Sequence, residues 1–408
     1  MLFYSSLYCF TLLLCSSKSI ARKPIMLVPG LMGTQLRGNV TRHPYWYCPK
    51  VVDDYVWVND VLIIPPIHKC LLDSLGLQWN NETNEITQKE GVSIAPFDFG
   101  GLGAISYADE LEKTFHVVKT YAPFIEYLTA LGYVERETLF GIPFDWRFGM
   151  VHPDSFWSDV TKLIEDAYTK NSNQKVVLVG HSMGALFINY FLMIKQTKEW
   201  REKYIDSVLL VAPSITGSFL TFTVVLTRTI PYLGFLGDLT DSTQKLGGVD
   251  IHFPNYEIFG NRPFYTDENG NKYSASELKK ALKNEGIYDS DQSISKIFEA
   301  NEDYISKIPP AFDVPTAIVY NTAVETIAYL DRSNKTFQYY YGPGDREVHG
   351  EGVEYLCNQW NTKYLVDCFN VKNVTPAATH GSLMHQNVTY EYLLDHINNE
   401  DWKKLRNN

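Results

Sequence analysis

Short apolar runs alternate along the chain with amphipathic stretches. The runs are rich in β-branched residues, several stop at glycine or proline, and they lie at residues 24–28, 175–179, 206–212, 316–320 and 336–341. Such runs predict fully buried strands. Amphipathic or apolar helical spacing follows at residues 111–131, 154–168 and 185–195. Strands that alternate with helices predict a mostly parallel sheet with helices on both faces.

Three stretches fall outside this alternation. Residues 39–93 are aromatic and irregular, and they predict an insertion rather than strands of the central sheet. Residues 219–237 are strongly apolar but contain Arg228 and Pro231; a central arginine is costly in lipid, so a mobile apolar lid is favoured over a membrane span. Residues 265–308 are polar and helix-prone, which is typical of a cap. We therefore expect one domain over residues 22–408, with insertions at about 39–93 and 214–310.

The first 15 residues are apolar and uncharged, and small residues follow at positions 16, 17 and 19. This pattern predicts a signal peptide over residues 1–21, and therefore export. An uncleaved membrane anchor is the alternative, but the run is short for a span of about 20 residues.

Four cysteines remain after residue 21, an even number that suits two disulfides in an exported chain. Three pairings are possible, and the two short loops, Cys48–Cys70 and Cys357–Cys368, are favoured. Glycosylation sequons stand at Asn39, Asn81, Asn334, Asn373 and Asn387.

The formal net charge of −11, without a lysine or arginine run, argues against nucleic-acid binding. The histidines and cysteines show no metal-ligand spacing, so neither a metal nor another cofactor is expected.

The pentapeptide from Gly180 to Gly184 places Ser182 between a buried strand and a buried helix. Gly-x-Ser-x-Gly in that context predicts the sharp turn that exposes a nucleophilic serine in acyl transfer. The oxyanion of the reaction needs two backbone N–H groups. We expect them from Met183, directly after the nucleophile, and from Leu31, in the loop after the first strand.

A nucleophilic serine needs a base and an acid. Folds with such a strand–turn–helix around the serine supply both later in the chain, in the order Ser, Asp, His. Asp345 stands in a glycine-rich turn after a predicted strand. Among the later histidines, His349 is too near Asp345 and His396 is expected on a helix surface. His380 has a loop position, but by spacing alone His385 remains a rival.

Five ordered blocks carry a family resemblance: residues 28–36 (Val-Pro-Gly-Leu-Met-Gly-Thr-Gln-Leu), 141–147 (Gly-Ile-Pro-Phe-Asp-Trp-Arg), the Ser182 pentapeptide, Trp200 with residues 203–205, and 341–360. From about residue 24 to its end, the chain resembles the lecithin:cholesterol acyltransferase family, which includes lysosomal (group XV) phospholipase A2. The resemblance implies an α/β-hydrolase fold and a triad of Ser182, Asp345 and His380. It favours His380 because residues 380–393 match the family's last His-to-helix segment without a gap.

The resemblance also implies an activity. The expected enzyme is a phospholipase A and O-acyltransferase that moves a fatty acyl group from a glycerophospholipid, through acyl-Ser182, to water or a lipid alcohol. It would be secreted or lysosomal, monomeric, and active at a phospholipid membrane or lipoprotein surface. A general lipase or carboxylesterase is the alternative enzyme, and a catalytically inactive lipid-binding relative is the alternative from another class.

The Cys48–Cys70 loop matches a disulfide-closed loop of the family. Its apolar side chains, namely Trp57, Val61, Leu62, Ile63 and Ile64, suit either docking on lipid or ordinary core packing.

Two departures from the family pattern stand near the expected site. Residues 344–348 read Gly-Asp-Arg-Glu-Val where the family has Gly-Asp-Gly-Thr-Val, and residues 214–217 read Ser-Ile-Thr-Gly where it has tryptophan and glycines.

Overall fold

The computed structural model describes residues 22–404 except 44, 60, 61, 63, 65, 109–118, 231–238, 240, 289 and 290. The predicted signal peptide lies outside the described residues, as do Val61 and Ile63 and parts of the predicted stretches 111–131 and 219–237.

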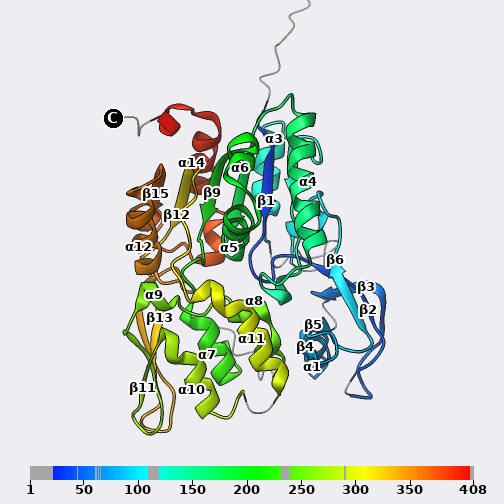
Figure 1. The fold of residues 1–408 in the computed structure, drawn as a ribbon, viewed down its shortest axis with the longest axis vertical. Coiled ribbons are helices and arrows are strands. Elements are labelled where there is room, and N and C mark those ends of the chain that lie inside the picture. The colour runs from blue at the N-terminus through cyan, green and yellow to red at the C-terminus, as the bar shows by residue number, and fades with distance from the viewer. Residues whose placement is uncertain are drawn as a thin grey trace, which may run out of the picture.

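Six parallel strands form the central sheet, in the order β15-β12-β9-β8-β1-β7 (Figure 1). Their bounds are β1 Ile25–Val28, β7 Leu139–Gly141, β8 Val176–His181, β9 Ile205–Val211, β12 Thr316–Tyr320 and β15 Val366–Asn370. The predicted parallel sheet is confirmed. Four of the five predicted strands belong to it, and β7 and β15 were not predicted.

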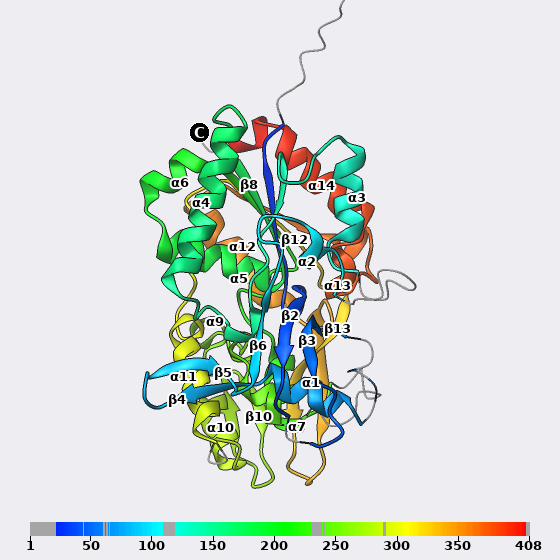
Figure 2. The same cartoon turned by 90° about the vertical axis from the view of Figure 1, so that its right-hand side faces the viewer.

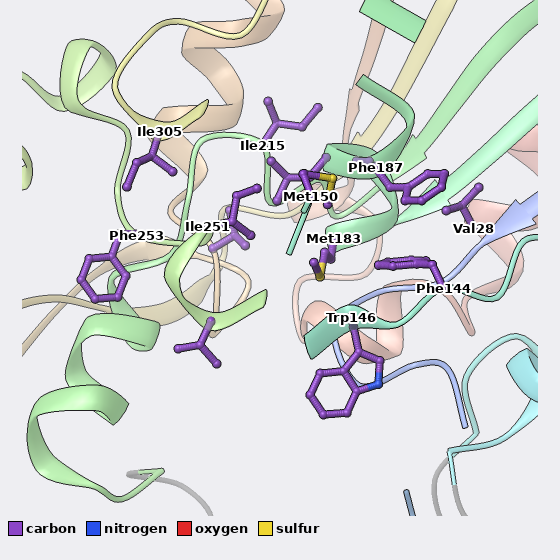
Figure 3. Packing of buried hydrophobic residues seen from close by; sticks show 14 of the residues in the cluster. Val28, Phe144, Trp146, Met150, Met183, Phe187, Ile215, Ile251, Phe253 and Ile305 are labelled. Carbon is purple, nitrogen blue, oxygen red and sulfur yellow. The ribbon is translucent and has the colours of Figure 1, made fainter. Parts of the chain in front are cut away.

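Successive side chains of these strands point to opposite faces of the sheet, so each strand contributes side chains to two hydrophobic cores. Val28 and Leu178 contribute to one core, and Leu27 and Val179 to the other. Helices α4 (Asp154–Lys170), α5 (Met183–Tyr190), α6 (Lys198–Tyr204) and α12 (Gly350–Asn361) cover the first face; α2 (Gly103–Ser106), α3 (Ala122–Ala130), α13 (His380–Leu383) and α14 (Asn387–Asn398) cover the second (Figure 2). In Figure 3, the rings of Phe144 and Phe187 pack beside Val28 in the first core. This layered arrangement is the α/β-hydrolase fold.

The segment 39–93 is more regular than predicted. It contains an antiparallel sheet in the order β3-β2-β6, a hairpin and a helix, and among the described residues none of these strands joins the central sheet. The bounds are β2 Leu36–Val40, β3 Val51–Trp57, α1 His68–Leu75, β4 Leu77–Asn80, β5 Glu85–Gln88 and β6 Val92–Pro96.

A second accessory sheet, in the order β11-β10-β13-β14, lies at the same end of the molecule (Figures 1 and 2). Its strands are β10 Pro263–Thr266, β11 Lys272–Ser274, β13 Val324–Asp331 and β14 Gln338–Gly344, and its helices are α7 Phe219–Thr227, α8 Gly247–Asp250, α9 Tyr256–Phe259, α10 Leu278–Asn284 and α11 Gln292–Ile305. The strand predicted at residues 336–341 is therefore present, but it does not belong to the central parallel sheet as expected. It is part of β14, which pairs antiparallel with β13 in the accessory sheet.

The predicted helix at residues 111–131 and the predicted lid at residues 219–237 differ in part from expectation. In the described part of the stretch predicted helical at residues 111–131, the helix begins at Ala122, because Pro123 lacks an N–H and fits only the first turn. In the predicted lid, Phe219 and Phe222 of α7 are fully buried and stack on each other, so this half of the stretch is fixed in the core. Within the described residues, no helix is long and apolar enough to span a bilayer.

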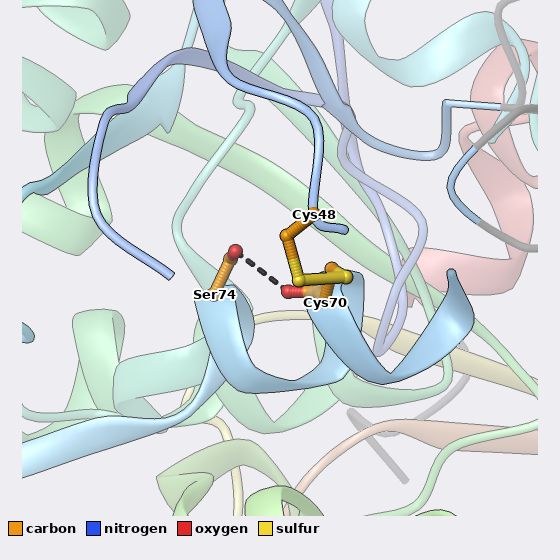
Figure 4. The surroundings of a disulfide bond; sticks show 3 residues. All are labelled: Cys48, Cys70 and Ser74. Carbon is orange, nitrogen blue, oxygen red and sulfur yellow. Dashed lines mark hydrogen bonds between the residues drawn. A yellow bond between two sulfur atoms is a disulfide. The ribbon is translucent and has the colours of Figure 1, made fainter. Parts of the chain in front are cut away.

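Both favoured disulfides are present. Cys48 bonds Cys70 on α1, with an S–S distance of 2.05 Å, and the hydroxyl of Ser74 donates to the carbonyl of Cys70 one turn earlier (Figure 4). Cys357 bonds Cys368 and thereby ties α12 to the edge strand β15. The first disulfide therefore lies within the accessory segment, and the second lies at the edge of the central sheet.

Candidate active site

Ser182 occupies the turn between β8 and α5 with a strained backbone, φ 54° and ψ −120°. The turn can be this sharp because its neighbours are small. A Cβ on Gly184 would lie only 2.1 Å from the carbonyl oxygen of Val28, so a larger residue would push the helix away from β1. The local sequence therefore raises the Ser182 hydroxyl above the end of the sheet, as the pentapeptide predicted.

Three side chains from distant parts of the chain form one hydrogen-bonded line. Nε2 of His380 lies 2.7 Å from Oγ of Ser182, and Nδ1 of His380 lies 2.9 Å from Oδ2 of Asp345. Because a carboxylate only accepts, Nδ1 carries the hydrogen, and in the neutral ring Nε2 is left to accept the serine proton. All three side chains are buried. The arrangement can activate a serine for nucleophilic attack.

The bulky turn at Asp345 does not displace its carboxylate. Oδ1 accepts the backbone N–H groups of Glu347 and Val348, at 3.0 and 2.7 Å, which leaves Oδ2 for His380. Arg346 adopts the left-handed φ of 90° in a place where the family has glycine, and its N–H donates to Oγ1 of Thr326 on β13. The accessory sheet thus supports the strained turn.

Glu347 adds a second carboxylate to the site, with Oε2 3.9 Å from Nε2 of His380. Burial lowers the pKa of His380, but the negative charges of Asp345 and Glu347 outweigh it and raise that pKa to about 9. The sequence showed Glu347 as a departure from the family pattern, but it did not show that this side chain approaches the histidine.

His181 joins the site through a contact that the sequence did not predict. Its Nε2–H donates to the carbonyl oxygen of His380 at 3.1 Å, and the N–H of His380 donates to the carbonyl of Asp345 at 2.7 Å. Burial and the positive charge of His380 lower the pKa of His181 to about 3, so its ring stays neutral. The pentapeptide therefore supplies both the serine and a tether for the histidine.

The two backbone groups expected in the oxyanion hole flank the serine. The loop that contains Leu31 presses against the nucleophile, since a Cβ on Gly30 would lie 2.8 Å from Cβ of Ser182. Met183 is the first residue of α5, and the first N–H groups of a helix have no acceptor within it.

Ser182 and His380 open into a cavity of about 450 Å³. Its walls are mainly apolar and include Leu31, Met32, Trp57, Leu71, Leu75, Leu220, Val224, Ile230, Leu246, Val249 and Met384. Among the described lining residues, Lys119 is a lysine and Glu347 carries a carboxylate. A long apolar chain with one polar end fits such a cavity.

The other histidines are engaged elsewhere. Nε2 of His385 donates to the carbonyl of Thr120, which removes it as a rival to His380. His396 was predicted on a helix surface, and this is wrong: its side chain is buried and bonds Asp367 on β15. His349 is buried at the start of α12. Among the described residues, no group of His, Cys, Asp and Glu is arranged to hold a metal ion.

All five sequon asparagines are exposed, at positions 39, 81, 334, 373 and 387. Asn39 lies on β2, and its side-chain oxygen accepts the N–H of Asp53 at 3.0 Å.

Comparisons with known proteins agree with this geometry. Residues 52–230 match the sequence model of the family described as Lecithin:cholesterol acyltransferase. The phosphatidylcholine-sterol acyltransferase of Gallus gallus is 25% identical over 83% of this chain and 82% of its own length. The lysosomal phospholipase A and acyltransferase of Bos taurus is 26% identical over 83% of each chain.

Among solved structures, the one titled "The crystal structure of Tle4-Tli4 complex" superposes with a TM-score of 0.54 at 13% identity, over 94% of this chain and 99% of that one, and it supports the fold alone. Residues 52–230 of the chain are therefore similar to the lecithin:cholesterol acyltransferase family, and the described residues adopt an α/β-hydrolase fold.

Proposed function

We propose that this protein is a serine phospholipase A and O-acyltransferase. The observation that carries the proposal is the continuous line Ser182–His380–Asp345 at the wall of an apolar cavity. The line supplies an activated nucleophile, and the cavity suits the fatty acyl chain of a glycerophospholipid. The relatives named above carry out phospholipid acyl chemistry by their names, which supports the same substrate class here.

The proposed mechanism has two halves. In the first, Ser182 Oγ attacks the ester carbonyl while Nε2 of His380 takes its proton, and the N–H groups of Leu31 and Met183 stabilise the oxyanion. His380 then returns the proton to the departing lysophospholipid oxygen. In the second half, water or a lipid alcohol attacks acyl-Ser182, with His380 again as base. Asp345 keeps the imidazole in the required tautomer throughout.

The Cys48–Cys70 segment is the proposed docking surface for a phospholipid membrane or lipoprotein. Trp46 is 96% exposed, and Tyr45 and Ile64 are also exposed. Three large apolar side chains on one loop favour insertion at a lipid interface. In contrast, Trp57 and Leu62 pack inward; the indole N–H of Trp57 donates to the carbonyl of Met32.

The segment 214–310 is the proposed cap over the acyl chain, since Leu220, Val224, Leu246 and Val249 all line the cavity. Export is part of the same proposal: the two disulfides and the exposed sequons suit a secretory route, and one set of relatives is named lysosomal.

The test uses phosphatidylcholine liposomes that contain a sterol or ceramide, at acidic and neutral pH, with Ser182→Ala as control. We expect free fatty acid and acylated alcohol from the wild type and neither from the variant. A fluorophosphonate probe should label the wild type at Ser182. Activity retained by Ser182→Ala would refute the mechanism, hydrolysis of short soluble esters alone would favour a general carboxylesterase, and an unlabelled Ser182 would favour an inactive lipid-binding relative.

A further inference from the structure

A second serine–histidine pair lies in the same cavity. Ser214 follows β9 and His252 follows α8, and both line the cavity that contains Ser182. The two side chains are almost fully buried, and Oγ of Ser214 lies 2.8 Å from Nε2 of His252. The line Ser182–His380–Asp345 uses neither residue.

The direction of this hydrogen bond follows from the other ring nitrogen. Nδ1 of His252 faces the carbonyl oxygen of Gly248, which can only accept, so Nδ1 carries the hydrogen. Nε2 is then an acceptor, and the hydroxyl hydrogen of Ser214 must point toward it. Burial lowers the pKa of His252 to about 4, so the ring is neutral and the direction is kept at all higher pH values. Ser214 therefore offers lone pairs, not a proton, to the cavity.

The pair is held beside the nucleophile by the backbone. The N–H of Ser214 lies 3.4 Å from the carbonyl oxygen of Ser182, and the N–H of Ser218 donates to the carbonyl of His252 at 2.6 Å. The N–H of Asn255 donates in turn to the carbonyl of Thr216 at 3.0 Å. Two bonds thus fasten the loop after β9 to the segment after α8, so the hydrogen-bond acceptor at Ser214 is preorganised.

We infer that the Ser214–His252 pair binds the hydrolytic water during deacylation and thereby favours hydrolysis over transfer to an alcohol. The inference rests on the proposed function. Water has two hydrogens: one goes to Nε2 of His380 as the water oxygen attacks the acyl carbonyl, and the other is donated to Oγ of Ser214. The tetrahedral intermediate then releases Ser182, which recovers its proton from His380, and the free fatty acid retains the second hydrogen. A simple alcohol has a single hydroxyl hydrogen, which His380 must take, so it gains nothing from Ser214.

The experiment measures the ratio of free fatty acid to acylated sterol, formed from phosphatidylcholine liposomes that contain a fixed fraction of sterol. Both products come from one acyl-enzyme, so the ratio is independent of the acylation rate. Loss of one hydrogen bond to the water should lower the ratio about three- to tenfold in Ser214→Ala. Ser158→Ala, on the exposed surface of α4, is the matched control and should keep the wild-type ratio.

His252→Phe should lower the ratio in the same direction, and the double variant should fall no further than Ser214→Ala, because the two side chains act as one unit. A wild-type ratio in Ser214→Ala would overturn the inference, as would additive effects in the double variant. Products that persist in Ser182→Ala would instead overturn the proposed function, and the inference with it.

Discussion

Glu347→Gln should move the pH profile of the enzyme toward neutrality. The carboxylate lies 3.9 Å from Nε2 of His380 and stabilises the protonated imidazole. At that distance Coulomb's law gives about 1 kcal/mol in water and about 4 kcal/mol at an effective dielectric constant of about 20. Because the Glu347 side chain is 39% exposed, the lower value applies. It corresponds to a decrease in the His380 pKa of about one unit.

The sign of the activity change follows directly. His380 acts as a base only when it is neutral, and with a pKa of about 9 about 1% of it is neutral at pH 7. A pKa lower by about one unit raises that fraction to about 9%, so the rate at pH 7 should rise up to tenfold.

The assay is the rate of fluorophosphonate labelling at Ser182 between pH 5 and 10, with a neutral probe that does not require a lipid surface. Glu391→Gln, an equal charge change on the exposed face of α14, should leave the profile in place. An unshifted profile in Glu347→Gln would show that this carboxylate does not act on His380.

Three further predictions concern other parts of the molecule. Asp345→Asn should lower the rate of fatty acid release by about 10³-fold or more, measured on liposomes, because His380 loses the partner that fixes its tautomer; a small loss would contradict the assigned acid. Trp46→Ala should weaken binding to phosphatidylcholine vesicles several-fold in a sedimentation assay and leave hydrolysis of a soluble ester unchanged, since this indole is almost wholly exposed. Burial raises the pKa of Asp250 well above its usual value, so its stabilising contribution is complete at acidic pH and is lost as pH rises through that pKa; the Tm of Asp250→Asn relative to wild type should therefore increase from pH 4 to pH 8, and a constant difference would count against this account.

Features that depend on neighbouring residues could be predicted from the sequence. The elbow at Ser182 needs a buried strand, small flanking residues and a helix, all within a few positions, and the buried strands reveal themselves as apolar runs. Helix α4 likewise follows from its own apolar spacing.

Features that depend on distant partners could not be predicted in this way. By spacing, His396 has a helix-surface position, but its side chain is buried and forms a hydrogen bond with Asp367, 29 residues earlier. The run at residues 336–341 has the composition of a strand, and composition does not show which sheet it joins. For the same reason spacing alone left His385 as a rival, and a family resemblance was needed to favour His380.

The two departures from the family pattern both lie at the active-site cavity. Glu347, in the turn after the acid, places a carboxylate near Nε2 of His380, and Ser214, in the loop after β9, places a hydrogen-bond acceptor in the cavity onto which that atom opens. Neither alters the line from Ser182 to Asp345, whose distances remain those of strong hydrogen bonds. Charge near Nε2 controls when the histidine is a base, whereas an acceptor near the acyl group controls which nucleophile reaches it. Variation in these two places should therefore change the pH dependence and the acyl acceptor of the enzyme, while the nucleophile and its acyl-enzyme stay the same.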